Sequence, residues 1–144
     1  MRKTLNCMKT SFLAVPENEA FSRSVVSSFA MQFDPDVEQL ADVRLAVSEA
    51  VTNCIVHAYK AAPSPGIVTV AAKRYEGGML KITVSDSGCG IEDVEAAKKP
   101  LFTTSPETER SGMGFAIMES SCDRMVVRSS PGKGTKVTLI KIIG

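Results

Sequence analysis

The chain has 144 residues and a mass of 15.4 kDa, enough for one hydrophobic core but not for two. Apolar residues make up 44% of it and charged residues 23%, which argues against a disordered or collagen-like protein. The 17 Lys and Arg nearly balance the 16 Asp and Glu, so the basic excess typical of nucleic-acid-binding proteins is absent. No apolar run is long enough to cross a bilayer, and the first residues are too polar for a signal peptide. We therefore expect a cytoplasmic protein with no direct nucleic-acid or membrane partner.

The first half of the chain predicts one strand and two helices. A loosely alternating stretch, Leu5–Ala14, predicts a strand. The apolar spacing of Glu17–Met31 then predicts an amphipathic helix. The longest periodic segment, Asp36–Tyr59, predicts a second helix, for which Asp36 is a candidate N-cap. A Pro- and Gly-containing stretch, Ala61–Gly66, ends this helix.

The second half predicts two hairpins separated by helices and a loop. The expected elements, in chain order, are strands Ile67–Arg74 and Met79–Ser85, a short helix near Asp93–Lys98, a loop over Lys99–Ser111, a helix over Gly112–Ser121, and strands Met125–Ser129 and Thr135–Ile142. Strands in hairpins and helices in blocks predict an α+β fold, namely a two-layer sandwich with helices on one face of a mixed, mostly antiparallel sheet. We expect residues 1–144 to form one domain.

Cysteine and histidine content limits the kinds of site that the chain can hold. The four cysteines lie far apart and form no C-x-x-C pair, so in a reducing compartment they are expected to be small buried hydrophobes: Cys7, Cys54, Cys89 and Cys122. The single histidine, His57, excludes a His-based metal cluster. It also leaves little room for a phospho-accepting histidine on a separate helix.

Three polar residues in the second predicted helix are candidates for a site. Glu49, Asn53 and His57 are four residues apart, so on an α-helix they lie on one face, a turn apart. Burying a carboxylate or an amide without a partner is costly, so this face either is a solvated edge or lines a cleft. In a cleft, the amide oxygen of Asn53 would suit Mg²⁺ and Glu49 would be a candidate base. The spacing alone leaves both interpretations open.

Two glycine-rich segments follow. The segment Asp86–Gly90 comes after an apolar strand. It is either an ordinary turn or a place where a carboxylate accepts from an exocyclic amine while glycines let the backbone approach a flat ring. Gly112-Met113-Gly114 precedes a helix, and is either a flexible junction or a phosphate cradle of backbone N–H groups. The chain has no P-loop motif and no Rossmann fingerprint.

The order of these motifs resembles the ATP site of the GHKL superfamily, which includes DNA gyrase and the sensor histidine kinases. A helical E-x-x-x-N is followed by D-x-G-x-G after a strand, a loop, G-x-G opening a helix, and Gly134-Thr135 before the last strand. The resemblance covers roughly Asp36 to Ile142. It implies the Bergerat ATP-binding fold, an ATP lid at about 98–111, and ATP or ADP with Mg²⁺ as ligands.

Three further segments narrow the resemblance. Residues 48–53, 100–104 and 109–119 are similar to the anti-sigma-factor serine kinases of spore-forming bacteria, and this similarity extends over the whole chain. It implies that Asn53 holds Mg²⁺ and that Glu49 orients or deprotonates the nucleophile. It also implies that Asp86 reads the adenine amine and that Thr135 supports the base.

The resemblance implies further roles for the glycines and the lid. Gly88 and Gly90 would allow close backbone approach to the base, and Gly112, Met113 and Gly114 would wrap the phosphates. Arg110 at the end of the lid would meet the γ-phosphate. The remaining expected nucleotide contacts are Thr103, Thr104 and Ser111. On the first helix, Arg23 would contact protein partners, although without the family it would be an ordinary surface arginine.

The resemblance implies an ATP-dependent anti-sigma factor that holds a sporulation sigma factor of the sigma F type and phosphorylates a serine of its anti-anti-sigma factor. It also implies a homodimer through the first strand and the first helix. Two alternatives remain open at this point. One is a switch kinase of the general stress response with a different sigma factor. The other is a non-enzymatic sigma-binding module that uses nucleotide only to set its shape.

Overall fold

The computed structural model describes residues 2–99 and 113–144. The first half holds one strand and two helices with short helical extensions: β1 (Thr4–Leu13), α1 (Glu17–Ala30), η1 (Met31–Phe33), α2 (Val37–Asn53) and η2 (Cys54–Ala58). The second half holds two hairpins and two short helices: β2 (Ile67–Tyr75), β3 (Met79–Asp86), α3 (Val94–Ala97), α4 (Gly114–Ser121), β4 (Arg124–Ser129) and β5 (Thr135–Ile142). The expected helices and strands are present within two residues of their predicted bounds, if η2 is counted with α2, and the expected loop over Lys99–Ser111 lies almost wholly outside the described residues.

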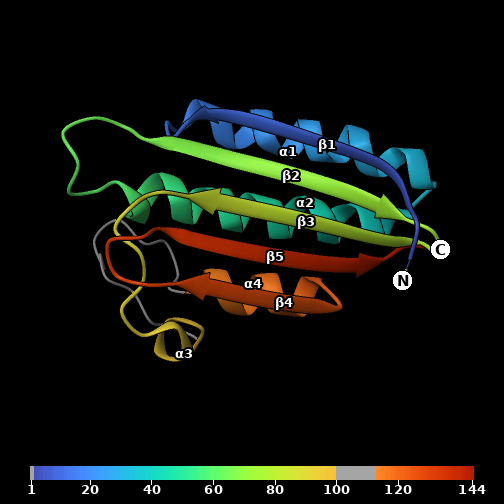
Figure 1. Ribbon diagram of the computed structural model, residues 1–144. Coiled ribbons are helices and arrows are strands. Elements are labelled where there is room, and N and C mark those ends of the chain that lie inside the picture. Colours follow the sequence, from blue (N-terminus) through green and yellow to red (C-terminus); the bar gives the residue numbers. More distant parts are fainter. Residues whose placement is uncertain (1, 100–112) are drawn as a thin grey trace.

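The five strands form one sheet in the order β1-β2-β3-β5-β4, and α1, α2 and α4 lie behind it (Figure 1). The predicted two-layer α+β sandwich is therefore confirmed. Among the described residues every strand pair is antiparallel, so the sheet is less mixed than the sequence suggested. The reason is that β2–β3 and β4–β5 are hairpins, and that α1 and α2 run in opposite directions and return the chain to the end of the sheet where β1 stops.

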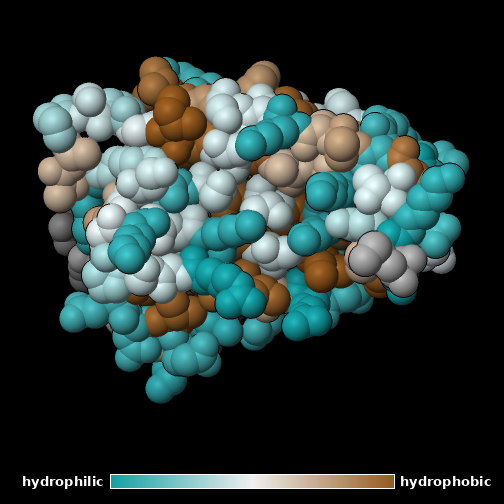
Figure 2. Space-filling view, viewed as in Figure 1, coloured by the Kyte–Doolittle hydropathy of each residue, from teal (hydrophilic) through white to brown (hydrophobic). Residues whose placement is uncertain are grey.

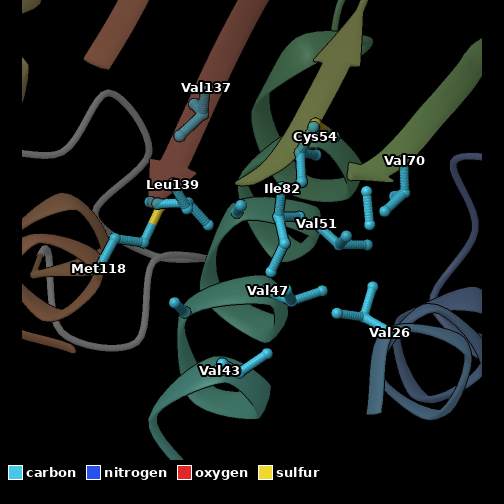
Figure 3. Close-up of a cluster of buried hydrophobic side chains, with 14 of the residues drawn as sticks. Val26, Val43, Val47, Val51, Cys54, Val70, Ile82, Met118, Val137 and Leu139 are labelled. Carbon is cyan, nitrogen blue, oxygen red and sulfur yellow. The ribbon is translucent and has the colours of Figure 1, made fainter. Parts of the chain in front are cut away.

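The core lies between the sheet and the helices. Alternate residues of β2 and β3, among them Val70 and Ile82, point toward the helical layer and are buried. Figure 3 shows Val43, Val47 and Val51 along the side of α2 that meets them. Within the part of the chain that the structure describes, the other face of the sheet meets no helix, and one solvated face is common in antiparallel sheets.

Contacts along α2 fix the helix that carries the candidate site residues Glu49 and Asn53. The Asp36 side chain accepts from the Gln39 N–H at 2.7 Å, and the Gln39 side chain accepts from the Asp36 N–H at 3.0 Å, so the predicted N-cap is confirmed as a capping box. Lys141 of β5 donates to Asp42 of α2 at 2.9 Å and to the Ser121 carbonyl of α4 at 3.1 Å, which ties three elements together. At its C-terminal end α2 widens into the π-helical turn η2, which the sequence pattern did not predict.

None of the helices in the described residues is both long enough and apolar enough to span a membrane.

Candidate nucleotide-binding site

A cavity of about 570 Å³ opens where β3 and β5 meet the C-terminal end of α2. Its walls come from η2, the segment after β3, the start of α4 and the β4–β5 turn. Most of the lining is apolar, as with Val84, Val137 and Phe115, and a few polar groups converge on it. This size and lining are typical of a site for a nucleotide-sized ligand.

Asp86, the last residue of β3, is held by three donors. Its Oδ1 accepts from the backbone N–H groups of Gly88 at 2.9 Å and Thr135 at 3.3 Å. Its Oδ2 accepts from the thiol of Cys54 at 3.3 Å. A carboxylate oxygen accepts more than one hydrogen bond, so Oδ2 can also accept from an amine of a ligand in the cavity. The sequence placed this carboxylate at a strand end, and the structure fixes its orientation.

Cys54 has a role that sequence reasoning missed. It is buried, as expected of an isolated cysteine, whereas Cys7 and Cys89 are exposed, so the expectation is wrong for those two. The turn η2 also directs the Cys54 thiol toward Asp86. Burial, followed by the charge and hydrogen bond of Asp86, raises the pKa of the Cys54 thiol well above its ordinary value. The sulfur therefore stays protonated and acts as a donor. The only indication of this role in the sequence was that Cys54 directly follows Asn53, a candidate site residue.

The segment after Asp86 lies so close to neighbouring backbone that side chains would not fit. A Cβ on Gly88 would collide with the Ala58 carbonyl, which already accepts from the Cys89 N–H at 2.8 Å. Gly90 has φ of +74°, a left-handed conformation, and a Cβ there would collide with the Ser130 carbonyl. Both glycines are therefore required by tertiary packing, which the D-x-G-x-G spacing alone did not show.

Tyr59 is a second residue that sequence reasoning missed. Its hydroxyl donates to the Ile67 carbonyl at 2.6 Å and accepts from the Ser87 N–H at 2.8 Å. It thereby joins the start of β2 to the segment after Asp86. Burial raises the pKa of Tyr59, although the hydrogen bond from Ser87 acts against the rise. No periodic pattern could have indicated this contact, because the partners are backbone groups.

Glu49 and Asn53 meet the start of α4. A Cβ on Gly114 would lie 3.3 Å from both amide atoms of Asn53 and 3.6 Å from Oε1 of Glu49. Asn53 lines the cavity, and Glu49 lies one helical turn before it, half-buried. The first turn of α4, whose N–H groups have no partner within the helix itself, thus borders the same space as Asn53 and Asp86. His57 and Cys89 also line the cavity.

The remaining sequence-predicted residues are distributed as follows. Thr135 lines the cavity, and its hydroxyl hydrogen-bonds with that of Ser129 at 2.8 Å. Met113 directly precedes α4, and its carbonyl accepts from the Ile117 N–H at 2.9 Å. Arg23 lies on α1, lines no part of the cavity, and pairs with Glu19 at 3.7 Å. Five predicted contacts lie outside the described residues, as does the lid beyond Lys99: Thr103, Thr104, Arg110, Ser111 and Gly112.

The residues at the cavity fit a magnesium ion that is held mainly by a ligand. Residues 2–99 and 113–144 contain no group of three or more His, Cys, Asp or Glu side chains that could hold a metal. Mg²⁺ commonly takes one or two protein oxygens, with phosphates and water as its other ligands. The amide oxygen of Asn53 at the cavity wall suits this mode, with the carboxylate of Glu49 nearby.

Comparison with known proteins identifies the family of this chain. A family model described as a histidine kinase-like ATPase domain matches residues 12–141. The anti-sigma F factor of Caldanaerobacter subterraneus subsp. tengcongensis is 51% identical over 139 residues, which cover 96% of this chain and 95% of the relative. The anti-sigma F factor of Clostridium acetobutylicum is 50% identical over 94% of this chain and 93% of its own length. The chain belongs to the anti-sigma F factor family.

Solved structures that resemble this family member share its fold. The RsbU and RsbW domains of a Mycobacterium tuberculosis protein superpose with a TM-score of 0.70 at 20% identity, over 96% of this chain and 32% of that one. The mycobacterial sensor histidine kinase MprB gives a TM-score of 0.53 at 18% identity, over 94% and 98% of the two chains. The histidine kinase-like ATPase domain implies that the anti-sigma F family member binds nucleotide, and the cavity is the candidate place.

Proposed function

We propose that this protein is an ATP-dependent anti-sigma factor that binds a sporulation sigma factor, sigma F, and phosphorylates a serine of the anti-anti-sigma factor. The observation that carries the proposal is the convergence of Asp86, Asn53 and the start of α4 on one cavity. Similarity to anti-sigma F factors over almost the whole chain supports the assignment of the protein partners.

Adenine recognition is assigned to Asp86. The two backbone N–H groups on Oδ1 leave Oδ2 to accept from the exocyclic amine of adenine. The tight backbone at Gly88 and Gly90 would let the flat ring lie close to the chain. Thr135, fixed by Ser129, would support the base from the β5 side.

Phosphate binding is assigned to Asn53 and to the start of α4. The N-terminus of α4, which begins at Gly114, would offer N–H groups and a partial positive charge to the phosphates. Gly112 and Met113, directly before it, would wrap the phosphates with Gly114. Mg²⁺, held by Asn53 and the phosphates, would neutralise charge on them. Arg110, from the lid at about 98–111, would meet the γ-phosphate, and Thr103, Thr104 and Ser111 would contribute further contacts.

Glu49 is assigned as the base. Its carboxylate lies beside Asn53 and Gly114, within a side chain's reach of the phosphate end of the cavity. It would accept the proton of the incoming serine hydroxyl as the serine oxygen bonds to the γ-phosphorus, while the bond to the β-phosphate oxygen breaks and ADP leaves. Positioning and charge neutralisation would supply most of the rate acceleration.

Protein partners are assigned to the surface of α1 and β1. Arg23 pairs with Glu19 on α1 and its side chain is still 35% exposed, which leaves it accessible to the sigma factor and its antagonist. β1 is an edge strand, with Leu5 and Leu13 about half exposed, and Phe21 of α1 is 48% exposed. These apolar side chains support a homodimer through β1 and α1.

The test is phosphoryl transfer from radiolabelled ATP with Mg²⁺ to the anti-anti-sigma factor, with identification of the labelled residue. We expect wild-type protein to label one serine. Glu49→Gln should abolish transfer while ATP affinity changes less than about threefold, since Glu49 acts on the nucleophile and not on the nucleotide. Glu92→Gln, in an exposed residue of the same cavity wall, is the matched control and should transfer normally.

Two other outcomes would each identify a different function, and a third would change the role of Glu49. Nucleotide binding and sigma F binding without any transfer would identify a nucleotide-gated binding module. Transfer only to the antagonist of a stress-response sigma factor would identify a general-stress switch kinase. Unchanged transfer by Glu49→Gln would remove Glu49 from its assigned role.

A further inference from the structure

The open face of the sheet carries basic side chains and no acidic ones over β3, β5 and β4. Residues that alternate with the buried Leu80, Met125 and Leu139 must point to this face. The cations at these alternate positions are Lys81, Arg124, Arg128 and Lys136. Figure 2 shows hydrophilic side chains gathered over the middle and lower strands of this face.

The strand registers place like charges directly opposite each other. Arg128 of β4 pairs with Lys136 of β5, and Lys73 of β2 pairs with Lys81 of β3. Directly opposite side chains on one face have Cβ atoms about 5 Å apart, and like charges at that distance destabilise a sheet. The chain has nearly as many acidic as basic residues, so its composition does not force two like-charge pairs onto one face of the sheet.

No carboxylate compensates these cations within the described residues. The ion pairs there join Arg23 with Glu19, Lys98 with Glu95, and Lys141 with Asp42, all away from this face. Within residues 2–99 and 113–144 the side chains of Lys81, Arg124, Arg128 and Lys136 make no hydrogen bond, so their donors remain available to a ligand.

The same cations surround a groove of about 470 Å³. Five of its ten lining residues are Lys or Arg, counting Arg2 with the four above, and none is Asp or Glu. Between the cations lie Tyr75, Val126 and Ile140. Ile140 stands opposite Arg124 on one side and Lys81 on the other, so charged and apolar side chains alternate across the strands.

We propose that this groove on β3, β5 and β4 is a docking surface for an extended acidic segment of a partner polypeptide. An extended segment places every second side chain on one face, so several of its carboxylates can face the cations of the groove at once. The surface lies on the opposite face of the sheet from Glu49 and Asn53, and at its β4–β5 end Arg128 and Lys136 also border a hollow lined by Asp86 and Thr135.

An acidic polypeptide fits this groove better than nucleic acid or a second copy of this chain. Nucleic acid is disfavoured because the apolar side chains between the cations have no phosphate to meet, and because the chain as a whole is nearly neutral. A second copy of this chain is disfavoured because an isologous contact centred here would bring cations against cations. Charge complementarity therefore selects the acidic segment.

The test measures anisotropy of a labelled peptide of about twelve residues that alternates glutamate with valine, long enough to cross the groove. The reference probes are the same peptide with glutamine in place of glutamate, and a single-stranded oligothymidine of similar length. The variants are Arg128→Glu and Arg128→Gln. Arg44→Glu, an exposed arginine on α2 that contacts Ser27 at 3.3 Å, is the matched control.

We expect wild-type protein to bind the glutamate peptide, with affinity falling as salt rises above about 0.1 M. Arg128→Glu should weaken binding about tenfold and Arg128→Gln about threefold, whereas Arg44→Glu should change it less than twofold. Folding of each variant is checked by its thermal midpoint, which Arg128→Glu should not lower because it replaces a like-charge pair.

Four outcomes would overturn the proposal. They are no binding of the glutamate peptide at low salt, equal binding of the glutamine peptide, equal weakening by Arg44→Glu, and tighter binding of oligothymidine. Light scattering adds a fifth: if Arg128→Glu dissociates a wild-type dimer, the surface joins two copies instead. Phosphoryl transfer to the anti-anti-sigma factor is measured separately, so failure of this proposal leaves the proposed kinase function untouched.

Discussion

Replacing Asp86 with asparagine tests the nucleotide site with a change of specificity. The amide oxygen of the variant would take the place of Oδ1, because that position accepts two backbone N–H groups, from Gly88 and Thr135. The amide NH₂ would then take the place of Oδ2, beside Cys54 and the cavity. A donor would stand where the wild-type protein offers an acceptor.

The expected effect follows from this reversal. The adenine amine would lose a charge-assisted hydrogen bond and face another donor, which costs about 2–3 kcal/mol. ATP affinity should therefore fall roughly 30- to 150-fold. Inosine triphosphate (ITP) carries hypoxanthine, which has a carbonyl acceptor in place of the adenine amine. We therefore expect wild-type Asp86 to repel ITP and the asparagine variant to accept it. The preference for ATP over ITP should fall by at least about a hundredfold.

Isothermal titration of ATP and ITP against each protein measures both quantities. Asp93→Asn is the matched control, because Asp93 lines the same cavity and caps α3 by accepting from the Ala96 N–H at 3.0 Å. Asparagine caps a helix as well as aspartate does, so this variant should keep the wild-type preference. Equal losses of ATP and ITP affinity in Asp86→Asn, or no loss of either, would refute the assignment of Asp86 as the adenine reader.

Three further predictions concern the packing, ionisation and surface charge described above. Gly90→Ala should lower the free energy of unfolding in urea by more than about 2 kcal/mol, while Gly132→Ala should cost only about 1 kcal/mol: both have φ near +75°, but only at Gly90 would the Cβ strike backbone. The pKa of Cys54 is raised in the folded state, which therefore favours the protonated thiol. The contribution of this group to the stability of the fold is complete below the ordinary thiol pKa of 9.0 and is lost as pH rises above that value. Above pH 9.0 the free energy of unfolding of the wild-type protein, measured in urea, should therefore fall with pH more steeply than that of Cys54→Ala, by up to about 1.4 kcal/mol per pH unit. Equal slopes of this free energy against pH in the two proteins would contradict the assigned ionisation. Arg128→Glu should raise stability by about 0.2–1 kcal/mol in a thermal melt at low salt, because it places opposite charges across from each other, and a gain that survives high salt would show another cause.

Local sequence patterns were sufficient to predict the helices and strands and the order of the motifs. The period-2 alternation of β2 and β3 and the helical spacing of α2 each depend on one face being buried, and both are visible in the sequence. The capping box at Asp36 involves residues only three apart, and it too was predictable. The motif order was enough to indicate an ATP site of the GHKL type, to which the family match corresponds.

The π-helical turn η2 was not predictable in this way. Its residues, Cys54–Ala58, continue the apolar helical pattern of α2, and nothing in that spacing separates an α-helical from a π-helical turn. The hydrogen bonds of Cys54 and Tyr59 depend on this turn and reach Asp86 and Ser87, 32 and 28 residues away in the chain. Contacts of that range are made only when the sheet and helix pack.

The sequence by itself determined which residues alternate, which helices begin where, and which polar residues interrupt apolar segments, because those properties arise from neighbours within a few residues. The tertiary structure alone decided how Asp86 is oriented, why Gly88 and Gly90 admit no side chain, and which cations stand opposite each other on the open face. Each of these depends on strand register and on the approach of distant backbones. Such distances are fixed when the whole core packs, and no window of the sequence contains them.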